Sequence, residues 1–180
     1  MKMKFSKFII IPLLIAALAA VLSLFTTVLA DTGWFVSTVG FTWIAFQSWA
    51  VYFFAGCTLK GGIRALIGYT MGIIASIIIM VLGGWFASNG ISGMYATALA
   101  IFIIVIPVMC LERVPWFDLI PALFVGSGAF FALMTYEGEA GFCKVACTEL
   151  VFCLIGLIFG WITIALRSRY EACVAKKAAE

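Results

Sequence analysis

The sequence predicts an all-α polytopic membrane protein with six transmembrane helices, and three observations support this. The 180 residues are 66% hydrophobic and 11% charged, whereas soluble domains average about 45–50% apolar and about 25% charged. Six apolar stretches are separated by short polar breaks, and each approaches the roughly 20 residues that cross the hydrocarbon core. The positive charges lie at the ends of these stretches rather than in a patch. Without a basic patch, the sequence does not indicate nucleic-acid binding.

The apolar stretches make up one transmembrane domain, 1–180. We predict spans at Phe8–Ala30, Val39–Gly56, Ile63–Ala87, Met94–Leu111, Trp116–Met134 and Leu150–Leu166. Turn-forming or charged residues separate them at 31–33, 60–62, 88–90, 112–115 and 136–139. Because these breaks are short, consecutive helices are expected to be antiparallel neighbours.

The charges predict the orientation. Cytoplasmic loops of membrane proteins carry the excess of Lys and Arg. Ten of the eleven such residues fall on one side of the six spans: Lys2, Lys4, Lys7, Lys60, Arg64, Arg113, Arg167, Arg169, Lys176 and Lys177. Only Lys144 falls on the other side, together with Asp31, Glu137, Glu139 and Glu149. Both termini are therefore expected in the cytoplasm.

The first stretch has a second interpretation. The lysines at 2–7, the apolar run and Val28-Leu29-Ala30 before Asp31 also resemble a secretory signal with a cleavage site. The run is longer than the roughly 7–15 apolar residues of such signals. Cleavage would leave five spans and an external N-terminus. An internal repeat in the sequence favours retention.

The two halves of the chain resemble each other. Phe46–Phe53 in the second span and Phe124–Phe131 in the fifth place phenylalanines and small residues at matching positions. Ile67–Gly72 in the third span and Ile155–Gly160 in the sixth share the pattern Ile-Gly-x-x-x-Gly. Two similar motifs in the same order indicate a repeated unit.

This repeat predicts a three-helix unit at 1–90, a second at 91–169 and a cytoplasmic tail at 170–180. Two units of three spans must insert with opposite orientations. Such inverted repeats recur in transporters, where the solute site lies between the units near the bilayer midplane. The sequence therefore predicts an inverted 3+3 arrangement.

Glycines four residues apart let helix backbones approach closely. Gly68 and Gly72 in the third span, and Gly156 and Gly160 in the sixth, have this spacing. We expect them to pack the third helix against the sixth within one subunit. A contact between subunits is the alternative, and a homo-oligomer is compatible with a chain of this size.

Neutral polar and aromatic residues at corresponding places in the repeat are candidates for a solute path. They are Gln47, Ser48, Phe53, Gly126, Ser127, Gly128 and Phe131. A Gln side chain in hydrocarbon needs a partner, so Gln47 either bonds another helix or offers its amide to a solute. The phenylalanines either form constrictions that exclude hydrated ions or face lipid and neighbouring helices.

Ionisable groups are expected at span ends only. Asp118 and Glu149 lie at such ends, whereas ion-coupled carriers usually hold a charge within a span. The chain has no His and no CxxC pair, so neither a metal site nor another cofactor is predicted. Without a nucleophile beside a base, it is not predicted to be an enzyme. Cys143 and Cys147 fall on the outer side, where a disulfide is conceivable, but one helical turn between them gives poor geometry.

Two segments carry a family resemblance. Tyr52–Leu66 and Ile120–Ala132 resemble the YcdZ-type family of small, uncharacterised bacterial inner-membrane proteins. The resemblance extends over roughly residues 43–161, although Ser48 stands where the family tends to have Gly. It implies a location in the bacterial inner membrane and a multi-pass topology. It implies no substrate and no site residues.

We therefore expect a channel or facilitator for a small neutral or weakly polar solute, such as urea, ammonia, a short amide or a small acid in its neutral form. A non-transporting membrane scaffold or regulatory protein is one alternative. An ion-coupled transporter that uses Asp118 or Glu149 is another. The expected partners are the lipid bilayer and a small solute.

Overall fold

The computed structural model describes residues 5–36 and 41–179. Lys2, Lys4 and the predicted start of the second span at Val39 lie outside these residues. The described elements are helices joined by turns, with no strand among them: α1 (Phe5–Phe8), α2 (Ile10–Ala30), α3 (Thr42–Phe54), α4 (Leu59–Ser88), α5 (Gly93–Cys110), the 3-10 turn η1 (Leu111–Arg113), α6 (Ile120–Glu137), the 3-10 turn η2 (Gly138–Ala140) and α7 (Gly141–Ala179). The all-α prediction is confirmed.

Four helical segments of the described residues are long and apolar enough to cross a membrane. They are Phe5–Ala30, Leu59–Ser88, Gly93–Arg113 and Ile120–Lys177, the last of which contains α6, η2 and α7. The chain is thus a multi-pass membrane protein. The 13 residues of α3 rise only about 20 Å, against a hydrocarbon core of roughly 30 Å, so α3 is not one of the four.

Two predicted boundaries differ from the structure. The expected break at 60–62 lies inside the first turn of α4, because the Thr58 hydroxyl caps that helix by accepting a hydrogen bond of 3.0 Å from the Gly61 amide. The sixth span was expected at Leu150–Leu166, but α7 begins at Gly141 and continues to Ala179. An ion pair of 2.8 Å between Arg167 and Glu171, one turn apart, supports this C-terminal extension.

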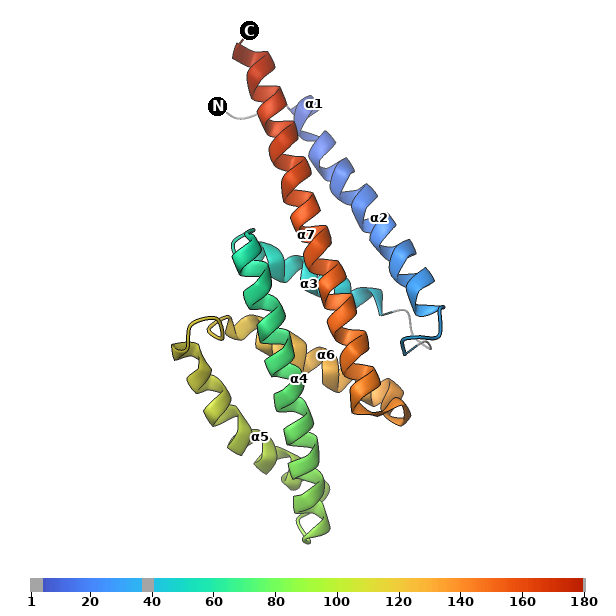
Figure 1. The fold of residues 1–180 in the computed structure, drawn as a ribbon, viewed down its shortest axis with the longest axis vertical. Coiled ribbons are helices and arrows are strands. Elements are labelled where there is room, and N and C mark those ends of the chain that lie inside the picture. The colour runs from blue at the N-terminus through green and yellow to red at the C-terminus, as the bar shows by residue number, and fades with distance from the viewer. Residues whose placement is uncertain (1–4, 37–40, 180) are drawn as a thin grey trace.

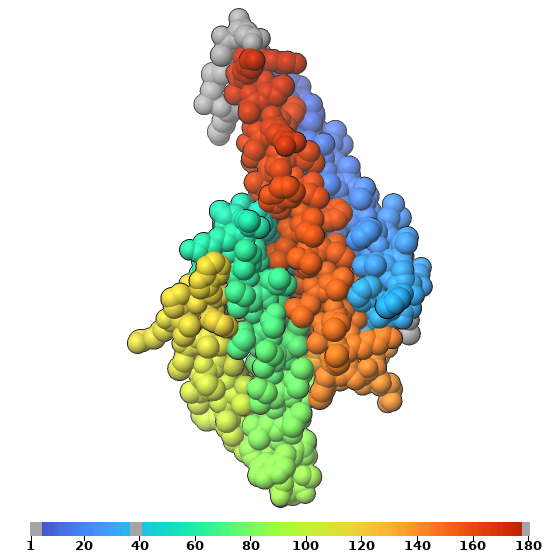
Figure 2. All heavy atoms as spheres, in the orientation of Figure 1, coloured from blue at the N-terminus to red at the C-terminus, as the bar shows by residue number. Residues whose placement is uncertain are grey.

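Two long helices organise the molecule (Figure 1). Helices α4 and α7 run along its length, and α3 and α6 cross them near the middle. Helix α2 lies beside α7, and α5 lies beside α4. In the space-filling view, side chains of α4 fill the surface between α5 and α7 (Figure 2). Helix α1 lies beside the C-terminal part of α7, where the Tyr170 hydroxyl donates a hydrogen bond of 2.7 Å to the Lys7 carbonyl.

The predicted glycines lie at two close helix crossings, but with other partners than expected. In the α4–α6 crossing, Gly68 and Gly72 face Ala122, Leu123, Gly126 and Ser127. In the α3–α7 crossing, Gly156 and Gly160 face Ala45, Ser48 and Tyr52. The third predicted helix therefore packs on the fifth, and the second on the sixth. Small residues on α3 and α6 allow this close approach, whereas Leu66 of α4 and Leu150 and Leu154 of α7 line a cavity shared by these two helices.

The core lies where α3, α4, α6 and α7 meet. Fully buried aromatic side chains come from each of these regions, including Phe41, Tyr69, Phe130 and Phe152. The rings of Phe41 and Phe152 meet edge to face with centroids 6.5 Å apart. This contact joins the start of α3 to α7.

Candidate functional site

A carboxyl group lies in the interior of the helix bundle. The Glu149 side chain is 0% exposed, and neither of its carboxyl oxygens has a hydrogen-bond partner among the described residues. Burying an ionised carboxylate without a partner is very costly. Ionisable groups placed in this way inside membrane proteins are typical of proton and ion pathways.

Other polar groups lie close to Glu149. Cys153 follows it by one turn of α7 and is fully buried, and the Ser48 hydroxyl on α3 donates a hydrogen bond of 2.6 Å to the Cys153 carbonyl oxygen. Tyr69 of α4 is also fully buried and belongs to the same core as Cys153. The Tyr69 hydroxyl is buried and has no hydrogen-bond partner among the described residues. Three helices thus bring hydroxyl, thiol and carboxyl groups together beside the α3–α7 crossing.

Thr148, the residue before Glu149, is hydrogen-bonded to the segment before α3. The Thr148 hydroxyl donates to the Lys144 carbonyl at 2.8 Å and accepts from the Val36 amide at 3.3 Å. Thr148 is fully buried, as is Val145 one turn earlier. One face of the first turns of α7 is therefore buried, and Glu149 lies on that face.

The α4–α6 crossing contains a different polar arrangement. The hydroxyls of Ser76 on α4 and Ser127 on α6 are hydrogen-bonded at 2.6 Å. Ser76 also lies 2.9 Å from the Gly72 carbonyl. Each of these two hydroxyls has a protein partner. Tyr69 of α4 also lies at this crossing, where its backbone faces Gly126 of α6.

The predicted solute-path residues do not line one cavity. Gln47, Phe53 and Gly128 are exposed on the outside of the bundle, and Phe131 is half-buried. Ser48 and Gly126 lie in the two different crossings. Ser127 is half-buried and bonded to Ser76. Of these candidates, Ser48 bonds the Cys153 carbonyl oxygen, one turn of α7 after Glu149.

Asp118, the second ionisable candidate, is already paired. Its carboxylate accepts a hydrogen bond of 3.0 Å from Nε of Arg64 and forms an ion pair with the same guanidinium. That hydrogen bond holds the pKa of the Asp118 carboxyl below its usual range. The pair joins the start of α4 to the loop before α6, so Asp118 acts as a structural contact at the end of the bundle.

The cysteines form no cross-link among the described residues. Cys143 and Cys147 are exposed thiols one turn apart on α7. The described residues also contain no group of three His, Cys, Asp or Glu side chains that could hold a metal ion. The polar groups around Glu149 are therefore the chemical feature that stands out in the interior.

Sequence reasoning placed Glu149 at the outer end of a span that begins at Leu150. The structure starts α7 eight residues earlier than Glu149, at Gly141, so the carboxyl lies two turns inside the helix. The signal was present in the sequence, because no Pro or Gly interrupts residues 142–155. Tyr69 and Cys153 were missed because both residue types are common in apolar cores.

Comparison with known proteins places the chain in a family. Residues 12–168 match DUF1097, a family described as a protein of unknown function. No curated protein and no solved structure matches the chain. The family match covers α2 to the larger part of α7 and includes both helix crossings and Glu149. The chain belongs to the DUF1097 family.

Proposed function

We propose that this protein transports a small neutral or weakly polar solute across the bacterial inner membrane, and that Glu149 binds and releases a proton during transport. The observation that carries the proposal is a carboxyl group that is 0% exposed and lacks hydrogen-bond partners among the described residues. The passive path expected from the sequence rested on spans free of ionisable groups. Because Glu149 is an ionisable group buried inside the bundle, that condition is not met, and the ion-coupled alternative is favoured.

Six spans with an inverted repeat are part of the proposal. If the unit 1–90 is superposed on the unit 91–169, α2 corresponds to α5, α3 to α6, and α4 to α7. The same correspondence converts the α3–α7 crossing into the α4–α6 crossing, and each crossing brings a glycine pair against small residues. The arrangement of the helices in Figure 1 agrees with this correspondence. In this scheme α3 is a short, tilted span that lies between longer helices.

The proposed topology has both termini in the cytoplasm. The hydrogen bond between Tyr170 and the Lys7 carbonyl joins α1 to the C-terminal part of α7, and both ends of the chain are rich in Lys and Arg. The inner-membrane location follows the resemblance to YcdZ-type proteins. With this orientation, Glu149 lies closer to the outer ends of the helices than to the cytoplasmic ends.

The chemistry of coupling follows from burial. A buried carboxyl group without a hydrogen-bond partner among the described residues favours its neutral form, because no contact of those residues offsets the cost of ionisation there. Release of the proton requires water or a solute to reach Glu149. Opening the bundle beside Ser48 and Tyr69 would supply that access and would expose their polar groups to the solute. Proton release and solute binding would then depend on the same motion.

Proteoliposomes test the proposal. Urea, ammonia, acetamide and acetic acid are each offered with and without an imposed pH gradient, and solute entry is followed by stopped-flow. We expect at least one solute to enter faster with the gradient. Glu149→Gln should abolish this dependence, while Glu139→Gln, at an exposed position, should retain it.

Two outcomes would contradict the proposal in different ways. Flux that is equal with and without the gradient, and equal in Glu149→Gln, would establish the passive facilitator instead. No flux for any solute, from protein shown to be folded, would favour the membrane scaffold. Both outcomes leave the fold and the family assignment unchanged.

A further inference from the structure

An apolar groove lies on the side of the bundle where α3, α4 and α7 meet. It has a volume of about 320 Å³ and is lined by apolar and aromatic side chains with Gly62. Tyr52 and Leu157 are buried at its base, whereas Leu59, Ile158 and Trp161 are 74%, 46% and 56% exposed at its opening. The groove therefore opens toward the surroundings of the helices rather than toward Glu149.

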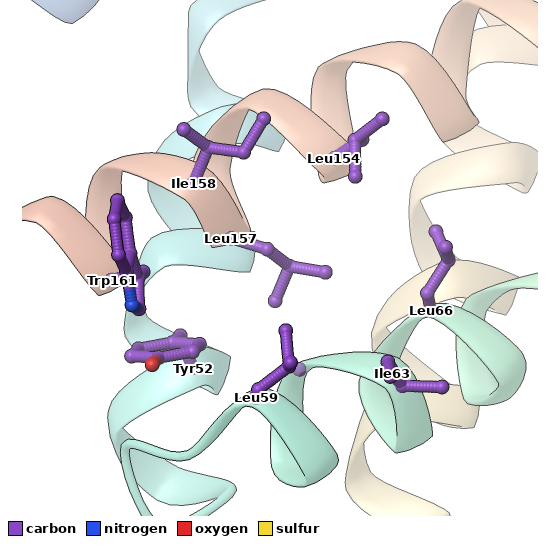
Figure 3. A pocket seen from close by; sticks show the side chains of 9 residues that line it. Tyr52, Leu59, Ile63, Leu66, Leu154, Leu157, Ile158 and Trp161 are labelled. Carbon is purple, nitrogen blue, oxygen red and sulfur yellow. The ribbon is translucent and has the colours of Figure 1, made fainter.

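The groove is apolar along its length, and its two aromatic lining residues lie at one end (Figure 3). Tyr52 and Trp161 lie side by side at one end with their oxygen and nitrogen atoms, and Leu59 lies next to them. Leu66 and Leu154 lie at the other end. Tyr and Trp in membrane proteins place their polar atoms at the level of the lipid headgroups. The direction of the groove is thus that of a lipid, with its headgroup beside Tyr52 and Trp161.

The groove continues beyond Leu66 and Leu154. These two residues also line a second cavity of about 230 Å³, together with Leu150, Val151 and Thr70. From Trp161 back to Leu150, the combined groove follows roughly 16 Å of α7. An extended hydrocarbon chain fits this long and narrow shape, whereas a polar solute would find almost no hydrogen-bonding group along it.

The first turn of α4, which lines the aromatic end of the groove, also carries a cation. Lys60 follows the lining residue Leu59, and its ammonium group is 5.5 Å from the centre of the Trp116 ring. Among the described residues Lys60 forms no ion pair, because the neighbouring guanidinium of Arg64 is the group that pairs with Asp118. A Lys at this level attracts anionic headgroups.

We propose that this groove is a binding site for one acyl chain of an anionic phospholipid, whose headgroup lies beside Lys60. The site is separate from Glu149 and does not depend on the transport proposal. Binding a lipid here would hold α4 and α7 together where their leucines line the groove, away from both glycine crossings. The bilayer around the helices supplies this ligand at high concentration.

Native mass spectrometry of the full chain in mild detergent tests the proposal. The protein is titrated with phosphatidylglycerol and with phosphatidylcholine of equal chain length. Ile158→Trp fills the groove, and Ile74→Trp is the matched control, since the two isoleucines are 46% and 43% exposed and only Ile158 lines the groove. We expect Ile158→Trp to weaken lipid binding at least about tenfold. Displacing two methylene groups of the acyl chain from the groove already corresponds to a roughly tenfold change in the dissociation constant. Ile74→Trp should bind lipid as the unmodified protein does.

The headgroup is tested by Lys60→Gln. This variant should lose the preference for phosphatidylglycerol while it still binds phosphatidylcholine. Equal lipid binding by Ile158→Trp and Ile74→Trp would overturn the groove as a lipid site. A lipid-free dimer that Ile158→Trp converts to a monomer would also overturn it and assign the groove to a second copy of the chain. An unchanged preference in Lys60→Gln would overturn the role of Lys60.

Discussion

The two glycine crossings have similar backbones but different polar interiors. At the α4–α6 crossing, Ser76 and Ser127 bond each other at 2.6 Å, so the polar groups are paired. Beside the α3–α7 crossing, Ser48 is bonded to the Cys153 carbonyl, yet Glu149 and the Tyr69 hydroxyl have no hydrogen-bond partner among the described residues. The difference teaches that close packing occurs at both crossings, whereas the interior beside the α3–α7 crossing holds a carboxyl group without a hydrogen-bond partner among the described residues.

The largest expected effects test what the crossings share. A methyl group on Gly156 would collide with the Ala45 carbonyl oxygen, and one on Gly72 with the Leu123 carbonyl oxygen. We expect Gly156→Ala and Gly72→Ala each to lower the free energy of unfolding by about 3 kcal/mol, at the upper end of overpacking effects. Unfolding in mixed micelles measures this loss.

The control for these variants is Gly84→Ala. A methyl group at Gly84 meets no atom within 4 Å, so this variant should be neutral or gain up to about 1 kcal/mol from helix propensity. Equal stability of Gly84→Ala and Gly156→Ala would show that the α3–α7 crossing is looser than described.

Glu149→Leu tests the group that distinguishes the two halves. Replacing an unpartnered buried carboxyl by an apolar side chain removes its desolvation penalty, which is about 1–3 kcal/mol for a buried polar group. We expect the variant to unfold at a higher denaturant concentration and to lose all dependence of solute flux on a pH gradient. A gain in stability together with unchanged coupling would separate Glu149 from transport.

Ser76→Ala should lower the free energy of unfolding, and by less than Glu149→Leu raises it. It removes the hydrogen bond to Ser127 between α4 and α6, and hydrogen bonds between membrane helices contribute about 0.6 kcal/mol on average. Thr70→Ala is the matched control, because the Thr70 hydroxyl bonds only the Leu66 carbonyl of its own helix. If Ser76→Ala stabilises the protein as Glu149→Leu does, the two crossings do not differ as described.

The smallest effect concerns the Arg64–Asp118 pair at the rim of the α4–α6 side. Because Arg64 lowers the pKa of Asp118, the pair contributes stability above the ordinary carboxyl pKa of about 3.9, and this contribution disappears as the pH falls below that value. Asp118→Asn should therefore have a lower melting temperature than the unmodified protein at pH 7, and this difference in melting temperature should shrink at pH 3. Glu139→Gln removes an exposed carboxyl that forms no ion pair in the described residues. Its melting temperature relative to the unmodified protein should therefore not change in this way between pH 7 and pH 3.

The membrane class of the fold could be predicted because it depends on composition. Long apolar runs at Ile63–Ala87 and Met94–Leu111 correspond closely to α4 and α5, since each is flanked by turn-forming residues. The partners of Gly68 and Gly156 could not be predicted, because a small-residue motif indicates a close approach without identifying the opposite helix.

The candidate site was less accessible to sequence reasoning. Ser48 was identified from the repeat, but its relation to Glu149 depends on how α3 crosses α7. Glu149 was placed at an interface because the sixth span was expected to begin only at Leu150, whereas α7 begins at Gly141. In the structure the Thr148 hydroxyl is bonded within α7 and to the Val36 amide, and that tertiary contact leaves no trace in the sequence.

The protonation of Glu149 can be tested before any solute is known. Infrared spectroscopy in lipid at neutral pH distinguishes the carbonyl band of a neutral carboxylic acid from the bands of a carboxylate. The buried, unpartnered carboxyl predicts a neutral-acid band in the unmodified protein and in Glu139→Gln, and no such band in Glu149→Gln. A neutral-acid band that persists in Glu149→Gln, or none in the unmodified protein, would contradict the account of Glu149 as the proton-binding group.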